Sequence, residues 1–439
     1  MASPKSSKTV TYVMAVIIVV LLVATVYEGL AVQNLSKTST ASSSTTSGVA
    51  VGVTTYTIGG LFPTTGDDAS CGVAALNSAQ AAVNDINTQM TTLGAPYHFN
   101  FVNIDVQSTA AGELTAITTL HGTDGVNAAL TFGSTETSGA IAYANSAHVL
   151  MLATGATGIG LTTPGGYLFR NIQSDSTFVK VAAATMYQLG FRKIVVMYEN
   201  DAYGQGFGTQ LPAIWANYTG TSSKTLGYAL NQNDYGAEVT QVSQLAQQLG
   251  VDNTTAWFWI GESTDSINIF QHAAQDPVLS HLQLFTKNAP VSTSADYPPN
   301  APVAVAQYLE NGSHVMGFTQ AVTEVNNPFT NLYWNNQPQP PCYANTYSWD
   351  GAWLLAKDLM LVGNNGPALK NALPTVASDF VGVSGPVQFD SSGDNIFGNY
   401  NSFNVHQFQN GTWYTQTNGL YDASAGKWSP IQNGATTIV

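Results

Sequence analysis

Apolar and polar positions follow two alternating periods along most of the chain. In the stretch 169–207, apolar residues recur at helical spacing between 176 and 189. Ile194–Met197 is then a short β-branched run, typical of a strand buried on both faces of a parallel sheet. Glu199–Gly208 follows as a polar, Gly-rich turn that opens the next helix. In open α/β sheets such turns lie at the carboxyl ends of strands, where ligands bind.

The same rhythm predicts the other elements. Strands are expected at 56–62, 98–105, 127–132, 149–154, 194–198, 223–229, 256–261 and 282–286. Helices are expected at 73–90, 109–121, 139–147, 176–189, 206–218, 237–249, 265–274 and 347–362, with a small-residue turn at 133–138. Because strands and helices alternate, the sequence predicts an α/β protein with doubly wound parallel sheets. Hairpin-like segments are expected between 387 and 415.

The N-terminus has a different pattern. Residues 9–32 begin with the uncharged, Val/Ile/Leu-rich run Thr9–Tyr27, which has the length of a membrane span. The basic residues Lys5 and Lys8 precede it, so residues 1–8 are expected on the cytoplasmic side. No small-residue cleavage site follows, which favours an uncleaved anchor over a removed signal peptide. Residues 33–53 are a Ser/Thr-rich linker.

The composition limits the classes of molecule that the protein could bind. Only 9% of the 439 residues are charged and the net charge is −14, which argues against a nucleic-acid partner. Neutral polar side chains provide most of the polarity, which suggests an acidic or otherwise harsh exterior. Asn217, Asn253, Asn311 and Asn410 head Asn-x-Ser/Thr sequons and are candidate glycosylation sites.

Two cysteines are present, Cys71 and Cys342. Outside the cytosol they could form a disulfide, and two unrelated buried thiols are the alternative. No CxxC or Cys/His cluster occurs, so no metal site is expected.

Signatures of catalysis are missing from the sequence. It contains no GxSxG elbow, P-loop, HExxH or strand-linked GxGxxG motif. The adjacent acids Asp67 and Asp68 lie in a loop, and adjacency alone is not acid–base geometry. We therefore expect no enzyme activity and no cofactor.

Five segments together resemble one family. They are IGGLFPTTGDDASCGVAALNSAQAAVNDIN, ATGATGIGLT followed by YLFRNIQSDS, IVVMYENDAYGQGF, YSWDGAWLLAKDL and GVSGPVQFDSSGDN. In this order they resemble the type 1 periplasmic-binding-protein family, close to the branched-chain amino-acid and amide-binding proteins of ABC importers. The resemblance spans about Thr55 to Gln409.

The resemblance implies two lobes joined by three crossings, with a ligand held between them. Lobe 1 would comprise 54–172 and 317–390, and lobe 2 would comprise 173–316 and 391–439. Both cysteines then fall in lobe 1 near the rim of the cleft, which favours a disulfide between them.

The resemblance also implies a set of ligand-binding residues. Ser134 and Thr135 would hold a carboxylate or amide of the ligand, although both could simply cap the next helix. Gly155 and Thr157 form the partner loop, for which a simple turn is the alternative. Tyr203 would close over the ligand from lobe 2, unless it is an ordinary surface tyrosine.

One family feature is missing. Members that bind α-amino acids hold the ammonium with an acidic residue after the strand that ends here near Thr286. This chain has Lys287 and the neutral Asn288 there, and Lys287 would repel a cation. Glu262 could supply the carboxylate from a neighbouring loop. The candidate ligands are therefore amino acids, amides, urea-like compounds or carboxylates.

These observations predict a membrane-tethered, extracellular solute-binding protein at the cell membrane. It would capture a small polar ligand for an ABC permease and its ATPases. The alternative is a ligand-sensing ectodomain coupled to a membrane receptor, and a third possibility is an extracellular enzyme or surface-layer protein built on the same lobes.

Overall fold

The computed structural model describes residues 52–261, 263–287, 297–320, 342–407, 409–422, 426–432, 434 and 436–438. The chain divides into two compact units, Met1–Gly52 and Val53–Val439, and every element below lies in the second. The expected cytoplasmic tail and anchor, and nearly all of the linker, lie outside the described residues. Within the described ranges, no helix combines the length and the apolar character that crossing a bilayer requires.

The first sheet has six strands in the order β13-β5-β4-β3-β1-β2. Their bounds are β1 Thr54–Leu61, β2 Tyr97–Asn103, β3 Ala128–Thr131, β4 Leu150–Ala153, β5 Leu168–Gln173 and β13 Asp394–Asn395. All neighbouring strands are parallel. The four expected strands are present, and β5 is a further buried strand that the pattern of apolar positions did not predict.

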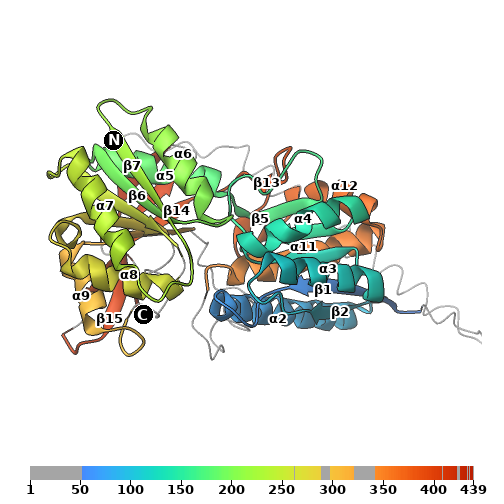
Figure 1. The fold of residues 1–439 in the computed structure, drawn as a ribbon. Coiled ribbons are helices and arrows are strands. Elements are labelled where there is room, and N and C mark those ends of the chain that lie inside the picture. The colour runs from blue at the N-terminus through green and yellow to red at the C-terminus, as the bar shows by residue number, and fades with distance from the viewer. Residues whose placement is uncertain are drawn as a thin grey trace, which may run out of the picture. The chain divides into compact units, whose positions relative to one another are not determined.

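Helices cover both faces of this sheet (Figure 1). They are α2 Ala69–Leu93, α3 Ala110–Asp124, α4 Ser134–Ala147, α11 Asn345–Val362 and α12 Gly366–Ser378. One face packs against α2, α11 and α12, and the other packs against α3 and α4. Helices α2 and α11 are far apart in the sequence and pack directly together. We call this sheet and its helices lobe 1.

The second sheet has nine strands, eight of them in the order β16-β15-β14-β10-β9-β8-β6-β7, with β17 also paired to β15. Their bounds are β6 Lys193–Glu199, β7 Ser222–Tyr228, β8 Thr255–Ile260, β9 Gln283–Lys287, β10 Met316–Gln320, β14 Tyr400–Gln407, β15 Trp413–Asp422, β16 Lys427–Pro430 and β17 Thr436–Ile438. Strands β6 to β10 are parallel, whereas β14 to β17 are antiparallel. The sheet is therefore mixed rather than wholly parallel, because the expected C-terminal hairpin joins its edge.

Strand β6 shows why this sheet is covered on both faces. Ile194 and Val196 pack with α5 and α6, whereas Val195 and Met197 pack with α7, α8 and α9. Successive side chains of a strand point to opposite faces, so an unbroken apolar run needs helices on both. The bounds are α5 Asp175–Gln188, α6 Gly204–Trp215, α7 Gly236–Leu249, α8 Ser263–Gln275 and α9 Val303–Gln307. We call this sheet and its helices lobe 2.

The remaining elements are short. They are the 3-10 helix Leu279–His281, the π-helix Tyr308–Gly312 and the paired strands β11 Val381–Gly382 and β12 Gly385–Pro386.

The chain passes between the lobes near residue 174, between the described elements β10 and α11, and near residue 397. The lobe boundaries differ slightly from the expected ones. Strand β10 pairs with β9, so lobe 2 extends past residue 316 to at least Gln320. Strand β13 pairs with β5, so lobe 1 extends past residue 390 to Asn395. Strand pairing sets these boundaries, and the local sequence pattern does not show which strands pair.

Candidate functional site

A cavity of about 240 Å³ lies at the carboxyl ends of parallel strands from both lobes. The cavity is lined by five of the residues that the family resemblance implied as ligand contacts. They are Ser134, Thr135, Gly155, Thr157 and Tyr203. The first four come from lobe 1 and Tyr203 comes from lobe 2. The strand ends of both sheets therefore converge on one cavity, as expected for open α/β sheets.

Helix α4 begins directly at this cavity. Gly133 is its N-cap and Ser134 its first residue, so the expected turn 133–138 is mostly the first turn of the helix. The Ser134 hydroxyl oxygen accepts a hydrogen bond of 3.0 Å from the Gly158 amide. Glu136, in the third helical position, turns its carboxyl back toward Gly133, where an added Cβ would lie 2.0 Å from Oε2. Glycine at residue 133 therefore leaves space for this carboxyl.

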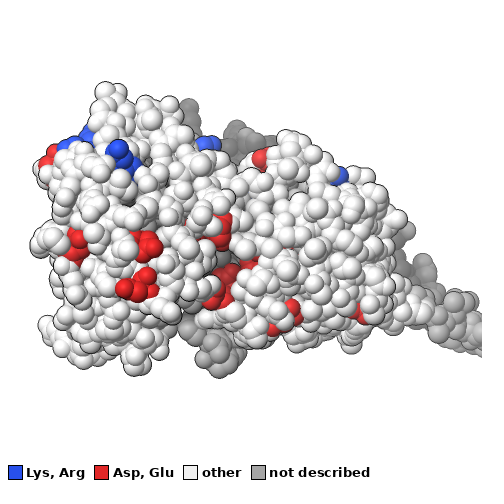
Figure 2. Space-filling model, viewed as in Figure 1, with Lys and Arg blue, Asp and Glu red and all other residues white. Residues whose placement is uncertain are grey.

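The cavity wall is strongly acidic. Asp67, Asp68, Glu136, Glu199 and Asp201 all line it, and none of the described lining residues is Lys or Arg. Figure 2 shows acidic side chains gathered around a hollow near the middle of this face, with the Lys and Arg side chains lying away from it. Adjacency in the sequence gave the Asp67–Asp68 pair no role, but the fold brings it to the same cavity as Glu199 and Asp201 of lobe 2.

Two of these acids carry raised pKa values. Burial, together with the nearby charge of Asp68, raises the pKa of Glu136 well above its usual range. Burial raises the pKa of Asp68, and the charge of Asp201 adds to that shift. Like charges close together in a partly dry site disfavour ionisation, so a positive group placed between them would restore it.

Hydrogen bonds join the two lobes across the cavity. The Asn231 side-chain amide of lobe 2 donates to Asp67 Oδ2 of lobe 1 over 2.8 Å. The Thr135 hydroxyl donates to the Asp201 carboxylate in the opposite direction. Asp201 also accepts hydrogen bonds from the amides of Tyr203 and Gly204 at 3.0 and 2.8 Å, which fixes the start of α6. The lobes are thus in contact at the cavity in this structure.

A buried ion pair lies behind the cavity. Lys287 Nζ is 2.5 Å from Asp175 Oδ1 and 2.9 Å from the Thr157 hydroxyl, and both charged side chains are 0% exposed. The Thr157 hydroxyl donates to Asp175 Oδ2 over 2.7 Å, so this network already uses its proton. The ammonium also lies 5.3 Å from the centre of the Tyr203 ring. The expected repulsion between Lys287 and a bound cation is therefore reduced by its paired carboxylate.

A second ion pair, in which the arginine is buried, holds the loop of Gly155 in place. Arg170, 1% exposed, forms an ion pair of 2.5 Å with Asp394. The same guanidinium donates to the carbonyl oxygens of Ala156 and Gly158 at 3.3 and 2.8 Å. Arg170 on β5 and Asp394 on β13 thus connect the cavity loop to two of the crossings between lobes.

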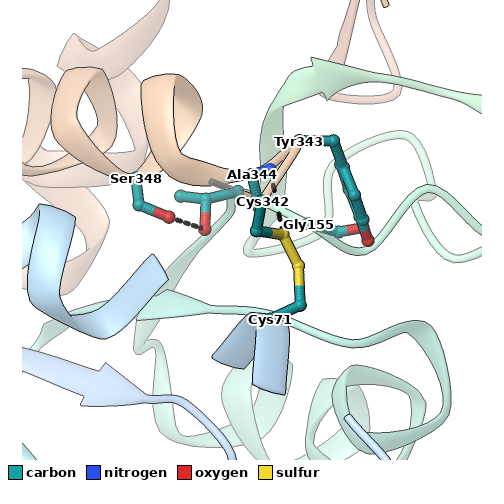
Figure 3. The surroundings of a disulfide bond; sticks show 7 residues. Cys71, Gly155, Cys342, Tyr343, Ala344 and Ser348 are labelled. Atoms are coloured by element: carbon teal, nitrogen blue, oxygen red, sulfur yellow. Dashed lines mark hydrogen bonds between the residues drawn. A yellow bond between two sulfur atoms is a disulfide. The ribbon is translucent and has the colours of Figure 1, made fainter. Parts of the chain in front are cut away.

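The structure joins Cys71 and Cys342 in a disulfide, with Cα atoms 5.3 Å apart (Figure 3). Cys71 lies in α2, and Cys342 lies just before α11. The neighbouring Tyr343 lines the cavity, and its hydroxyl donates to the Gly155 carbonyl over 3.3 Å. The disulfide therefore anchors one wall of the cavity to α2.

Two of the expected ligand contacts, Glu262 and Asn288, lie outside the described residues. The cavity is also lined by residues that the sequence did not single out, among them Asp201 and Tyr343. The sequence could have identified Asp201, because this residue follows the carboxyl end of a predicted buried strand. No such indication exists for Tyr343, because only the disulfide and the packing of α11 bring it to the wall.

The other sequence candidates lie at the surface. The sequon residues Asn217, Asn253, Asn311 and Asn410 are all exposed. Within the described ranges, no group of three or more His, Cys, Asp and Glu side chains is arranged to hold a metal ion.

Comparisons with known proteins agree on the fold. A leucine-binding protein, LivK, from Thermotoga maritima is 17% identical, with a TM-score of 0.65 over 87% of this chain and 97% of that protein. The branched-chain amino-acid binding protein LivJ from Streptococcus pneumoniae, solved with isoleucine, is 20% identical, with a TM-score of 0.62 over 88% and 99%. A solute-binding protein from R. palustris, solved with benzoate, is 16% identical, with a TM-score of 0.66 over 87% and 99%.

A search of curated protein sequences gives no match. The family model described as periplasmic binding protein matches residues 55–408. This range covers the first sheet from Thr55 onward, strands β6 to β10 and β14 of the second sheet, and every described residue that lines the cavity. The chain therefore belongs to the periplasmic binding protein family.

Proposed function

We propose that this protein is an extracellular solute-binding protein that captures a small polar molecule between its lobes and delivers it to an ABC permease. The observation that carries the proposal is the cavity at the strand ends, lined by Ser134, Thr135, Gly155, Thr157 and Tyr203. Its volume of about 240 Å³ suits a small molecule rather than a peptide or a polymer. The three structural neighbours described above support a solute-binding function, because one is named as a leucine-binding protein and the other two were solved with isoleucine and benzoate.

Capture would proceed by closure of the lobes without chemical turnover. A ligand that contacts both walls favours the arrangement in which the walls are close. The bonds Asn231–Asp67 and Thr135–Asp201 would form only in that arrangement, because each joins one lobe to the other. The closed form is then the state that a permease would recognise.

The location follows from other features. Residues 9–32 would anchor the chain in the membrane, and residues 33–53 would tether the lobes outside it. The Cys71–Cys342 disulfide suits an oxidising exterior, and the four exposed sequons are accessible to glycosylation there. Partial protease digestion of intact cells should release the lobes while the anchor stays in the membrane fraction.

A thermal-shift screen of the full chain tests the binding function. The panel contains branched-chain and polar amino acids, amides, urea, benzoate and amines. A ligand that binds only the folded state raises the melting temperature in proportion to the logarithm of its concentration. Small-angle scattering with a hit should show a smaller radius of gyration. Absence of any shift, or chemical conversion of a hit, would reject the proposal.

A further inference from the structure

The cavity is lined by several acidic side chains and not only by neutral polar ones. Asp68 and Glu136 lie on the lobe 1 wall, while Glu199 and Asp201 lie on the lobe 2 wall. Bringing two walls of the same sign together costs electrostatic energy, more so where water is displaced. A ligand of opposite charge would offset that cost, because it would interact favourably with both walls at once.

Glu136 is the group that most needs a partner. The residue is 1% exposed, no described Lys or Arg lies among the residues that line the cavity with it, and the group beside its carboxyl is another acid, the Asp68 carboxyl. A buried polar group without a partner is costly, and a charged one is more so. An ammonium or guanidinium group donates several hydrogen bonds and carries the complementary charge. Such a donor in the cavity would supply Glu136 with hydrogen bonds and a complementary positive charge.

The same residue disfavours a ligand carboxylate. The N-terminus of α4 points free amide groups and a favourable dipole at the cavity, which by itself would attract an anion. Glu136 places its own carboxyl there, in the space that Gly133 leaves open. A carboxylate ligand at this helix end would therefore lie against a carboxyl group of the protein.

We propose that the cavity selects a small organic cation that carries no carboxylate, with its ammonium or guanidinium group held by the neighbouring carboxyls of Asp68 and Glu136. Phe132, Tyr203 and Tyr343 line the same cavity and offer apolar contact to the carbon chain of the ligand, while the Lys287 ammonium already lies 5.3 Å from the centre of the Tyr203 ring. An organic cation fits better than a metal ion, since the described residues provide no cluster with metal-ligating geometry. This inference rests on the proposed solute-binding function and specifies its ligand.

Matched pairs of probes that differ only in the carboxylate test the proposal. Isothermal titration calorimetry on the full chain compares isopentylamine with leucine, and agmatine with arginine. We expect each amine to bind at least about tenfold more tightly than the amino acid with the same side chain. Tighter binding of leucine, arginine or benzoate would overturn the proposal and leave the solute-binding function supported. Binding of none of these probes, with amides and urea also silent, would reject both.

Two variants locate the cation. Glu136→Gln keeps the shape of the side chain and removes its charge, so it should weaken amine binding at least about tenfold. Asp124→Asn is the matched control, because Asp124 is an exposed acid at the end of α3 in the same lobe and should leave affinity unchanged. Asp68→Asn provides a second test should Glu136→Gln unfold. Unchanged amine affinity in a folded Glu136→Gln variant would overturn the assignment.

Discussion

At the scale of single residues, the buried charges behind the cavity are informative. Lys287 and Asp175 are both inaccessible to solvent and lie 2.5 Å apart. Burial raises the pKa of Asp175, and the charge of Lys287 opposes that shift. Taking two ions out of water is expensive, and their attraction offsets the cost only while both are present. Loss of either one should therefore cost far more than loss of an exposed ion pair.

Replacement of Lys287 tests this dependence. Lys287→Met should lower the free energy of unfolding by about 3–5 kcal/mol, because it leaves the Asp175 carboxylate buried without its cation. The double variant Lys287→Met/Asp175→Asn should recover part of that loss. Urea denaturation of the three proteins gives the comparison. A single variant as stable as the parent would show that the pair contributes little.

Protonation at the cavity should control binding of a cation. Asp68 and Glu136 both have raised pKa values, mainly through burial, with Asp67, Asp201 and Glu113 as the other charged groups that add to the shifts. Bound protons compete with a bound cation, so amine affinity should rise as the pH rises from acidic to neutral. Calorimetry in buffers of different ionisation enthalpy should also detect proton release on binding. A pH-independent affinity would contradict this coupling.

At the scale of elements, the position of α2 depends on one close approach. A Cβ on Gly72 would lie 2.2 Å from the Pro63 carbonyl oxygen in the loop that precedes the helix. Glycine therefore lets the first turn of α2 pack against the loop that carries Asp67 and Asp68. The disulfide at Cys71 fixes the same turn to the segment before α11.

Substitution of two helical glycines distinguishes the effect of a close packing contact from the effect of helix propensity. Gly72→Ala should lower the free energy of unfolding by about 1–3 kcal/mol, because a backbone atom must move. Gly122→Ala in α3 is the control, since no atom lies within 4 Å of its added Cβ, and it should raise stability by about 0.5–1 kcal/mol. Thermal melts of both variants decide this. Similar effects of the two substitutions would argue against the close approach.

Loss of the disulfide should affect both stability and binding. The double variant Cys71→Ser/Cys342→Ser should lower the free energy of unfolding by about 2–5 kcal/mol, because it frees residues 271 positions apart in the unfolded chain. Ligand affinity should also fall, since Tyr343 is held beside Cys342. Guanidinium denaturation and calorimetry measure the two effects. A reductant should change the parent protein and leave the double variant unaffected.

At the scale of the whole molecule, buried carboxyl groups link stability to pH. Burial raises the pKa of Glu113 to about 8, of Asp358 to about 7 and of Asp350 to about 6. In the unfolded chain these groups titrate near pH 4, so between pH 4 and the raised values the folded state holds more protons. Stability is therefore largest below the unfolded pKa and is lost as the pH rises through the folded pKa. Such behaviour suits the acidic exterior that the low charge content suggested.

The expected result is a melting temperature that falls as the pH rises from 5 to 7.5. Each of these groups should contribute up to about 1.4 kcal/mol per pH unit in its window. Glu113→Gln should flatten the profile, whereas Asp124→Asn should not. Asp105 acts in the opposite sense, because its hydrogen bonds lower its pKa to about 2, and its contribution is lost only in stronger acid. Melts across pH 3–8 that rise toward neutrality would contradict the prediction.

The sequence by itself determined most of the local structure and the region of the site. Hydrophobic periodicity located the eight expected strands, and the family motifs placed Ser134, Thr135, Gly155, Thr157 and Tyr203, all of which line one cavity. Local patterns suffice there because strand and helix periods depend on neighbouring residues, and because the carboxyl ends of parallel strands share one edge.

The tertiary structure decided which distant residues meet. It paired Cys71 with Cys342 and Lys287 with Asp175, added β10 and β13 to their sheets, and turned the carboxyl of Glu136 toward Gly133. It also brought acids from both lobes around one cavity, which gave the site its charge. These arrangements depend on the path of the chain between lobes and on side-chain packing, and residue spacing along the sequence carries no record of either.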